Sequence, residues 1–322
     1  MLTYIARRVL YSIPVLFLST FVSFVFVSYA ANPLVAVRAN PRITPTAIHL
    51  LIVQNHLDKP VVVRYFYWLQ SVFTDKLGKS LITLKPIWPD ITRTMGHTAQ
   101  LIIISETLAI ILGIAVGIYS AIRQYSPFDY TFTTVSFLGF AMPVFWLALV
   151  LQVLFVDVYQ HWHVRIFYTS GLNTIPGGPA WSLDRLQHLA LPVITLLVVS
   201  FALYSRYMRA SMLDVINSDY VRTARAKGVS ERKVVMRHVF RNALIPITTV
   251  AALNVGALLG GAIVTETVFT LDGMGHYFVL ALGQGDTYEV MAYLLVTAVI
   301  IIVFNLIADI TYGFLDPRIR YD

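Results

Sequence analysis

Six apolar stretches, each long enough to cross a membrane as a helix, alternate with polar segments along this chain. A membrane-spanning helix needs roughly 20 consecutive, mainly apolar residues. The stretches cover residues 9–30, 99–122, 130–158, 189–208, 244–265 and 290–313. The pattern therefore predicts an all-α integral membrane protein with six transmembrane helices, in which a long external loop separates the first helix from the second.

Composition supports a membrane protein over a soluble one. The 322 residues are 57% hydrophobic and 13% charged, whereas a soluble domain usually carries about 25% charged residues. The mean hydropathy is +0.70. The net charge of +7 comes from Lys and Arg in the loops, a pattern that orients membrane helices and does not indicate nucleic-acid binding. The chain has no cysteine, which excludes disulfides, thiolate metal sites and cysteine nucleophiles.

The distribution of Lys and Arg predicts which ends of the helices face the cytoplasm, because short loops on that side carry the excess of basic residues. The basic residues next to the first, second, fourth and sixth stretches all fall on one side: Arg7, Arg8, Arg123, Arg206, Arg209, Arg222, Arg225, Lys227, Arg232, Lys233, Arg237, Arg241, Arg318 and Arg320. The loop after the fifth stretch has Glu266, Asp272 and Asp286 and neither Lys nor Arg. We therefore expect both termini in the cytoplasm.

The segment from 31 to 98 is placed outside although it is basic, because loops longer than about 60 residues translocate largely regardless of charge. Within it, the run from Val61 to Leu69 predicts a helix. This helix either lies at the membrane surface, where aromatic side chains are favoured, or packs on the ends of the spans. The chain then divides into a first helix (1–30), an extracytoplasmic loop region (31–98) and a core domain (99–322).

A basic insert, residues 210–243, lies between the fourth and fifth apolar stretches, and a segment so charged cannot sit in hydrocarbon. Ala224 and Gly228 are four residues apart, so they share a helix face, and both are small enough for another surface to approach. Gly228 suits the end of a helix, where a positive φ is often needed. The insert is predicted to form a helix, a glycine turn and a second helix.

The second helix of this insert is predicted to be amphipathic. Ser230 can cap it, and Glu231 in its first turn is favoured by the helix dipole. One row along the helix is apolar and another is cationic; the rows are Val235, Val239 and Ala243, and Lys233, Arg237 and Arg241. The two helices and the glycine turn are predicted to form a compact structure on the cytoplasmic face that can pass on a movement. The alternative is an ordinary charged loop that only enforces orientation.

This insert resembles the cytoplasmic coupling signature of permease subunits in bacterial ATP-binding cassette importers. More narrowly, it resembles the dipeptide/oligopeptide (and nickel) permease family. The general signature is Glu-Ala-Ala, three residues, Gly, nine residues, Ile-x-Leu-Pro. With Gly228 as its glycine, Arg222-Thr223-Ala224 stand at the Glu-Ala-Ala positions, so Arg222 replaces the Glu. Asn242-Ala243-Leu244-Ile245-Pro246 replaces the later motif, as in the peptide-permease version.

Other similarities to this family extend over the whole chain. They are Ile5-Ala6-Arg7-Arg8 with Pro14, Leu77-Gly78-Lys79-Ser80-Leu81, the run from Gly139 to Trp146, the run from Gly260 to Phe269, and Leu315-Asp316-Pro317-Arg318-Ile319-Arg320. The family usually has Pro-Gly-x-Gly after that phenylalanine. Here Asp272-Gly273-Met274-Gly275 keeps the glycines and lacks the proline.

The resemblance implies a type I ABC importer permease fold in the bacterial cytoplasmic membrane, and a subunit that is not itself an enzyme. It implies that the coupling residues, which contact a partner ATPase, are Tyr220, Val221, Arg222, Thr223, Ala224, Arg225, Ala226, Lys227 and Gly228. The implied partners are a homologous second permease, two cytoplasmic ATPases that carry ATP and Mg, an extracytoplasmic peptide-binding protein and membrane lipid. The expected cargo is a peptide, with nickel or another small solute as the alternative.

Four polar residues in or next to the predicted spans are candidates for lining the pathway. Glu106 and Asp309 are intramembrane acids, which are costly and face protein or water by default. Each either lines the path, forms an internal ion pair or is buried in protonated form. Asn254, near small residues that permit close helix packing, and Glu266 complete the set. A secondary transporter driven by protons through the two intramembrane acids remains a second hypothesis.

Two further patterns are weaker. Gly78-Lys79-Ser80 resembles half of a phosphate-binding loop, but Phe73 stands where that motif needs a glycine, so the chain itself is expected to bind no nucleotide. His161 and His163 flank Trp162 with no further ligand at suitable spacing, and we expect them in an interfacial aromatic belt without a metal. No catalytic motif is present.

Overall fold

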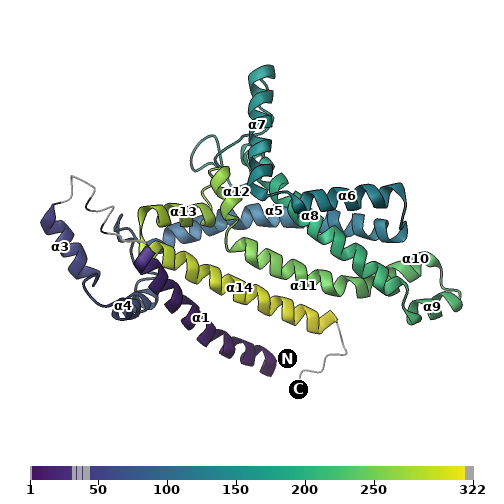
Figure 1. Ribbon diagram of the computed structural model, residues 1–322, viewed down its shortest axis with the longest axis horizontal. Coiled ribbons are helices and arrows are strands. Elements are labelled where there is room, and N and C mark those ends of the chain that lie inside the picture. Colours follow the sequence, from purple (N-terminus) through teal and green to yellow (C-terminus); the bar gives the residue numbers. More distant parts are fainter. Residues whose placement is uncertain (1, 31–33, 35–37, 39–43, 316–322) are drawn as a thin grey trace. The chain divides into compact units, whose positions relative to one another are not determined.

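Long apolar helices account for most of the structure. The computed structural model describes residues 2–30, 34, 38 and 44–315, and these residues form helices and loops without a β-strand. Within them, six helical segments are long and apolar enough to cross a membrane. These segments coincide with, or overlap, α1 (Leu2–Ala30), α5 (Ile87–Ile122), α7 (Val144–Trp162), α8 (Leu183–Ile216), α11 (Phe240–Leu259) and α14 (Thr287–Leu315) (Figure 1). The predicted all-α membrane fold with six spans is confirmed.

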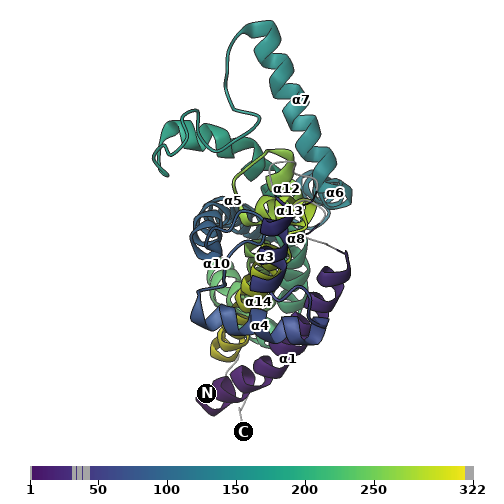
Figure 2. The same cartoon turned by 90° about the vertical axis from the view of Figure 1, so that its left-hand side faces the viewer.

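The third predicted stretch is not one helix, and this part of the prediction is wrong. Helix α6 (Pro127–Ala141) begins after the N-cap Ser126 and ends before Met142, and α7 starts after Pro143. Proline has no N–H to continue a helix, and it pushes the preceding residue out of the helical region. Met142 accordingly has φ −79° and ψ 123°. The chain changes direction here, and only α7 is long enough to span (Figure 2).

The fifth predicted stretch is also interrupted, close to its end. Helix α11 stops at Leu259, and the short α12 (Ile263–Val268) follows. Between them Gly261 has φ 129°, which L side chains rarely adopt, and a Cβ there would lie 3.0 Å from the backbone nitrogen of Gly275. Glycine therefore permits both the turn and the close approach of the two chain segments.

Two short helices, α3 (Pro45–Gln54) and α4 (Val61–Thr74), lie in the predicted loop region. The helix expected from residue 61 onward is confirmed. Its Tyr65 and Trp68 are fully buried and pack with Phe24 of α1, and the Tyr65 hydroxyl lies 3.0 Å from that of Thr20. The structure thus favours packing on the first span, and a location at the membrane surface stays a prediction.

The chain forms two compact units. The first comprises Met1–Ala99 and Leu259–Val303, and the second comprises Gln100–Leu258 and Phe304–Asp322. Aromatic and apolar side chains of α1, α4, α13 (Met274–Gln284) and α14 form the core of the first unit. The predicted boundaries at 30 and 98 stay predictions. Arg318, Arg320 and the terminal motif from Asp316 onward lie outside the described residues.

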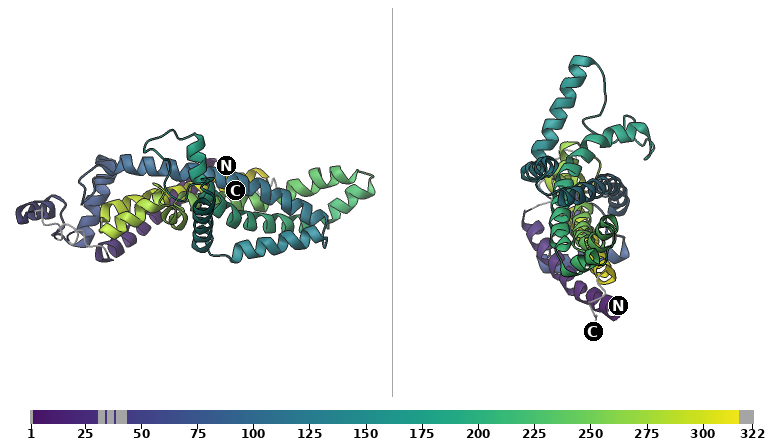
Figure 3. Two further views of the ribbon diagram at one scale, coloured as in Figure 1. Left: turned by 90° about the horizontal axis from the view of Figure 1, so that it is seen from above. Right: turned by 90° about the vertical axis from the view of Figure 1, so that its right-hand side faces the viewer.

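In the second unit, α5 and α8 approach each other closely through two glycines. A Cβ on Gly113 would lie 2.7 Å from the Tyr204 Cβ, and one on Gly117 would lie 2.6 Å from the Met208 Cβ. Small residues permit such close packing of membrane helices. Helix α8 ends at Ile216 and α11 begins at Phe240, so the basic insert connects them. The insert is visible as the green helices at the tip of this unit (Figure 3).

Candidate functional site

The basic insert folds as helix, glycine turn and helix, as predicted. Helix α9 (Asp219–Ala226) is followed by Gly228 with φ 74°, then by α10 (Glu231–Lys233) and the π-helix η1 (Val234–Val239), which continues into α11. Ser230 occupies the N-cap position of α10, but within the described residues its side chain makes no capping hydrogen bond. The predicted side-chain cap is therefore absent, while the predicted positive φ of Gly228 is confirmed.

The inner face of the insert is attached to its own chain. Val221 is fully buried and Ala224 is 8% exposed, and both pack in a cluster with Met208 and Met212 of α8. The small Ala224 therefore admits a close approach by α8 of the same chain, and its contact with a partner ATPase stays a prediction. Gly228 is different: among the described residues, nothing lies within 4 Å of the position that its Cβ would occupy.

The outer face of the insert is polar and largely basic. Tyr220 and Arg222 are exposed on α9. Arg225 donates two hydrogen bonds to Glu231 across the glycine turn, at 2.7 and 3.1 Å, and the Glu231 carboxylate raises the pKa of Arg225. Beyond the turn, an open hollow is lined by Arg232, Lys233, Met236, Arg237 and Arg241. The predicted apolar and cationic rows of the second helix are confirmed, because Val235, Val239 and Ala243 are buried.

The π-helical turn was not predicted. The backbone N–H of Phe240 donates to the carbonyl of Val235, five residues earlier, instead of the usual four. Such turns are rare and occur frequently at functional sites. The sequence of residues 234–239 has no local pattern that predicts a π-helical turn. In the structure, Val234, Val235 and Val239 of this turn pack into one apolar cluster.

Asp129, which was not predicted as a site residue, connects three helices through its carboxylate. It is buried in the first turn of α6, where its carboxylate accepts two hydrogen bonds from Arg209 of α8, at 2.6 and 2.8 Å, and one from Ser120 of α5. The hydrogen-bonded Arg209 guanidinium holds the pKa of Asp129 well below its usual range. The capping pattern of Ser126, Pro127 and Asp129 is a signal that could have placed the start of this helix.

Glu106 and Asn254, two of the four predicted pathway residues, meet in a buried network. The Glu106 carboxylate, 2% exposed, accepts hydrogen bonds from Ser200 at 2.5 Å, from Asn254 at 3.1 Å and from the Tyr204 hydroxyl. These donors come from α8 and α11. Among the described residues the hydrogen-bond partners of Glu106 are neutral and none forms an ion pair with it, so the interpretation as an internal ion pair finds no support there. Ser200 and Tyr204 were missed, although their spacing of four residues places them on one helix face.

Glu266, the third candidate, belongs to the first unit and is fully buried. Its carboxylate accepts hydrogen bonds from Thr98 at 2.6 Å and from the backbone N–H groups of Gly275 and His276 at 2.6 and 3.2 Å. It therefore caps the N-terminus of α13, where a negative charge is favoured. A Cβ on Gly273 would lie 2.4 Å from the Glu266 carboxyl carbon. This lack of space explains why the turn keeps a glycine at position 273, although it lacks the proline that the family usually has.

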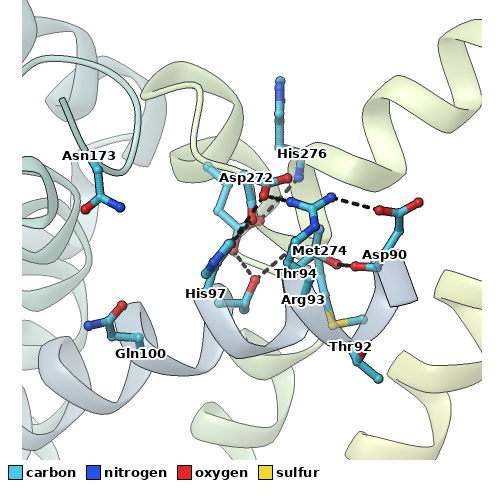
Figure 4. A network of polar contacts seen from close by, with 12 residues as sticks. Asp90, Thr92, Arg93, Thr94, His97, Gln100, Asn173, Asp272, Met274 and His276 are labelled. Atoms are coloured by element: carbon cyan, nitrogen blue, oxygen red, sulfur yellow. Dashed lines mark hydrogen bonds and ion pairs between the residues drawn. The ribbon is translucent and has the colours of Figure 1, made fainter. Parts of the chain in front are cut away.

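Next to this cap, Arg93 and His97 of α5 hold the loop before α13. Arg93 lies between the carboxylates of Asp90 and Asp272, and the Nδ1 atom of His97 is 2.7 Å from the Asp272 carbonyl oxygen (Figure 4). Asp309, the fourth candidate, lies partly buried on α14 in the second unit. The pathway role of all four candidates stays a prediction.

The two weaker motifs have ordinary structural partners. The Ser80 hydroxyl donates to Asp286 at 2.6 Å, so it is engaged inside the protein. His161 lies 3.2 Å from the Asp157 carboxylate. The prediction that His161 and His163 have no further ligand at suitable spacing is therefore wrong. Nevertheless, the described residues contain no group of three or more His, Cys, Asp or Glu side chains that could hold a metal.

Six spans, a basic helix–turn–helix inserted between the fourth and fifth, and acids buried among the helices together define a polytopic helical membrane protein. The family comparison agrees. Residues 113–321 match the family model described as "Binding-protein-dependent transport system inner membrane component", and residues 1–102 match the model of its N-terminal part. This chain belongs to that family and is a permease subunit of an ABC importer. The family membership gives no support to the proton-driven alternative.

Similar proteins match over their full length. The oligopeptide transport system permease protein AppB of Bacillus subtilis (strain 168) is 38% identical and covers 100% of both chains. The dipeptide transport system permease protein DppB of Escherichia coli (strain K12) is 34% identical over 100% of this chain and 99% of its own.

Solved structures confirm the fold. A chain of the inward-facing MetNI methionine ABC transporter matches with a TM-score of 0.54 and 14% identity, over 72% of this chain and 98% of its own. A chain of an amino acid ABC transporter matches with a TM-score of 0.50 and 13% identity, over 72% and 94%. At such identities the likeness shows the helix arrangement of ABC importer permeases and says nothing of the cargo.

Proposed function

We propose that this permease imports oligopeptides or dipeptides and forms half of a pathway that a homologous second permease completes. The full-length relatives named for oligopeptide and dipeptide transport support the peptide cargo over nickel. Two cytoplasmic ATPases carry the ATP and Mg, and an extracytoplasmic peptide-binding protein delivers the peptide. The chain lies in the bacterial cytoplasmic membrane with both termini inside, which is the orientation that its basic loops favour.

The basic insert is the surface through which a partner ATPase moves this chain. The observation that carries this proposal is its two-sided construction: an exposed basic face, and an inner face that is buried against α8. Because Val221 and Ala224 pack on Met208 and Met212, a displacement of α9 is passed to the spanning helix. ATP binding can shift the equilibrium between inward-open and outward-open states only through such differential contacts.

Gly228 provides a test, because its Cβ position is open while its backbone is left-handed. Placing a residue other than glycine in this conformation costs roughly 1–2 kcal/mol, and asparagine tolerates it best. Gly228→Val should lower peptide uptake and peptide-stimulated ATPase activity together, about tenfold for a strain of about 1.4 kcal/mol. Gly228→Asn should retain most of both activities.

Gly177 supplies a matched control, since it has φ 78° and, within the described residues, nothing within 4 Å of its Cβ position. It lies in the loop before α8, outside the basic insert. Gly177→Val therefore imposes similar backbone strain away from the coupling residues, and uptake should stay near wild type. Normal uptake and normal ATPase activity in Gly228→Val, with the complex assembled, would reject the coupling role.

A further inference from the structure

A cavity of about 420 Å³ opens between α5, α6 and α8 in the second unit. None of the four pathway candidates lines it. Its walls combine phenyl rings, hydroxyl groups and two guanidinium groups; the lining residues that matter here are Ser136, Phe137, Phe140, Ser205, Arg206 and Arg209. The cavity therefore offers apolar surface and positive charge side by side.

The two arginines of this cavity differ in their partners. Arg209 is neutralised by Asp129, which accepts two hydrogen bonds from it. Arg206 instead stacks over aromatic rings, with its Cζ atom 4.4 Å from the centroid of Phe137 and 4.8 Å from that of Phe140. In the described part of the chain it forms no ion pair with a carboxylate.

Arg206 therefore has aromatic neighbours and, among the residues that the structure describes, no carboxylate as a counter-ion. It lies near the end of Leu183–Ile216 that leads into the basic insert, in a helix that qualifies as a membrane span, where an unpaired charged side chain at the membrane keeps part of the cost of leaving water. The aromatic rings compensate only part of that cost, because a cation–π contact contributes about 0.5–2 kcal/mol. An anion from outside this chain can therefore pair with Arg206 in this cavity.

The surface next to Arg206 is apolar and open. Phe137 and Phe140 each expose 54% of their surface, and Val135 and Leu138 on the same helix expose 48% and 61%. Exposed apolar patches of this kind mark membrane or protein contacts. A ligand that fits the whole site has an anionic head next to the guanidinium and an apolar chain along α6.

We propose that this cavity binds an anionic phospholipid, with its phosphate on Arg206 and an acyl chain along Phe137 and Phe140. Basic pockets between membrane helices bind acidic lipid headgroups in this manner. A soluble anion satisfies the charge alone and leaves the apolar face uncovered, which is why the membrane lipid is favoured. The site is independent of the proposed peptide cargo.

The test uses the purified importer complex in nanodiscs that contain equal amounts of phosphatidylglycerol and phosphatidylcholine. Lipids that stay bound after mild delipidation are counted by native mass spectrometry. The wild type should retain phosphatidylglycerol in preference, and Arg206→Gln should reduce that preference about fivefold, because one basic residue contributes about 1 kcal/mol to binding of an anionic lipid surface. Arg206→Lys should retain the preference in part.

Arg165 provides the matched control. Its Cζ atom also lies over two aromatic rings, 4.4 Å from the centroid of Tyr159 and 5.1 Å from that of Tyr168, but at a different cavity. Arg165→Gln should leave the preference for phosphatidylglycerol unchanged. Monodispersity and helix content of each variant show that it is folded.

Five results would overturn the proposal. A wild-type complex without preference for phosphatidylglycerol does so whether or not any variant folds. So does an unchanged preference in Arg206→Gln, or an equal loss in Arg165→Gln. Release of the lipid by excess inorganic phosphate would show a site for a soluble anion instead. Loss of the second permease from Arg206→Gln, with lipid retention unchanged, would show that the surface is a subunit interface.

Discussion

Gly273 is the position at which a single methyl group should have the largest effect in the first unit. Its backbone, with φ −110° and ψ 173°, is accessible to any residue, so the requirement for glycine is one of space. A Cβ there would lie 2.4 to 2.6 Å from the three carboxyl-group atoms of Glu266. Those atoms are fully buried and cannot turn toward solvent. In Gly273→Ala the carboxylate must therefore leave its place.

The magnitude follows from the bonds that the carboxylate would lose. Glu266 accepts from the backbone N–H groups of Gly275 and His276, and a hydrogen bond to a charged group contributes about 1.5–3 kcal/mol. Loss of these two bonds predicts a destabilisation of about 3–6 kcal/mol. The assay is thermal unfolding of the purified protein followed by circular dichroism, and Gly273→Ala should have a Tm lower by several degrees.

Gly283 offers the matched control in the same helix, α13. Among the described residues nothing lies within 4 Å of its Cβ position. Alanine is favoured over glycine inside a helix by about 0.5–1 kcal/mol, so Gly283→Ala should be as stable as the wild type or slightly more stable. If Gly273→Ala unfolds at the wild-type temperature, the idea that the Glu266 cap determines this glycine is refuted.

Two further predictions concern the second unit. Asp129→Asn removes one partner of a buried ion pair, which typically costs about 3–5 kcal/mol of folding stability. The interaction with Arg209 depresses the pKa of Asp129 in the folded protein. The stability that the ionised Asp129 contributes is therefore complete above its unfolded pKa of about 4 and is lost as the pH falls through its folded pKa. Melting temperatures measured from pH 7 to pH 3 should fall less steeply in Asp129→Asn than in the wild type, and parallel curves would contradict the assignment. Tyr204→Phe leaves a buried carboxylate with one donor fewer and should cost about 1–3 kcal/mol in the same melt, whereas the exposed Tyr207→Phe should cost nothing; equal stability of both variants would show that the hydroxyl of Tyr204 does not contribute.

Local patterns predicted the elements that local physics determines. The six spans were found because the hydrophobic content of about 20 residues decides whether a helix can cross a membrane. The helix–turn–helix of the insert was found because Gly228 and the amphipathic rows after it are sequential features. The break at Pro143 was missed because proline can be accommodated inside membrane helices, as Pro192 in α8 is, and the sequence alone does not distinguish the two outcomes.

The contacts that give these elements their chemistry are not local. Glu106 and Asn254 are separated by 148 positions in the chain and share a hydrogen bond, and Thr98 and Glu266 are separated by 168. The polarity of Glu106 and Asn254 marked them as unusual in their apolar stretches, but no spacing rule relates residues so far apart in the sequence. Asp129 was missed for the same reason, since its partner Arg209 lies on another helix.

The sequence by itself determined the number of spans, the helical class and the position of the basic insert, because these depend on the transfer of short segments between water and hydrocarbon. The tertiary structure alone decided which small residue of the insert is covered and which is open. It also decided which buried acid meets which donor, and which arginine packs on aromatic rings with no carboxylate partner in the described part of the chain. These outcomes depend on the packing of helices that are distant in sequence, because a buried polar group must be satisfied by whatever neighbour the fold brings to it.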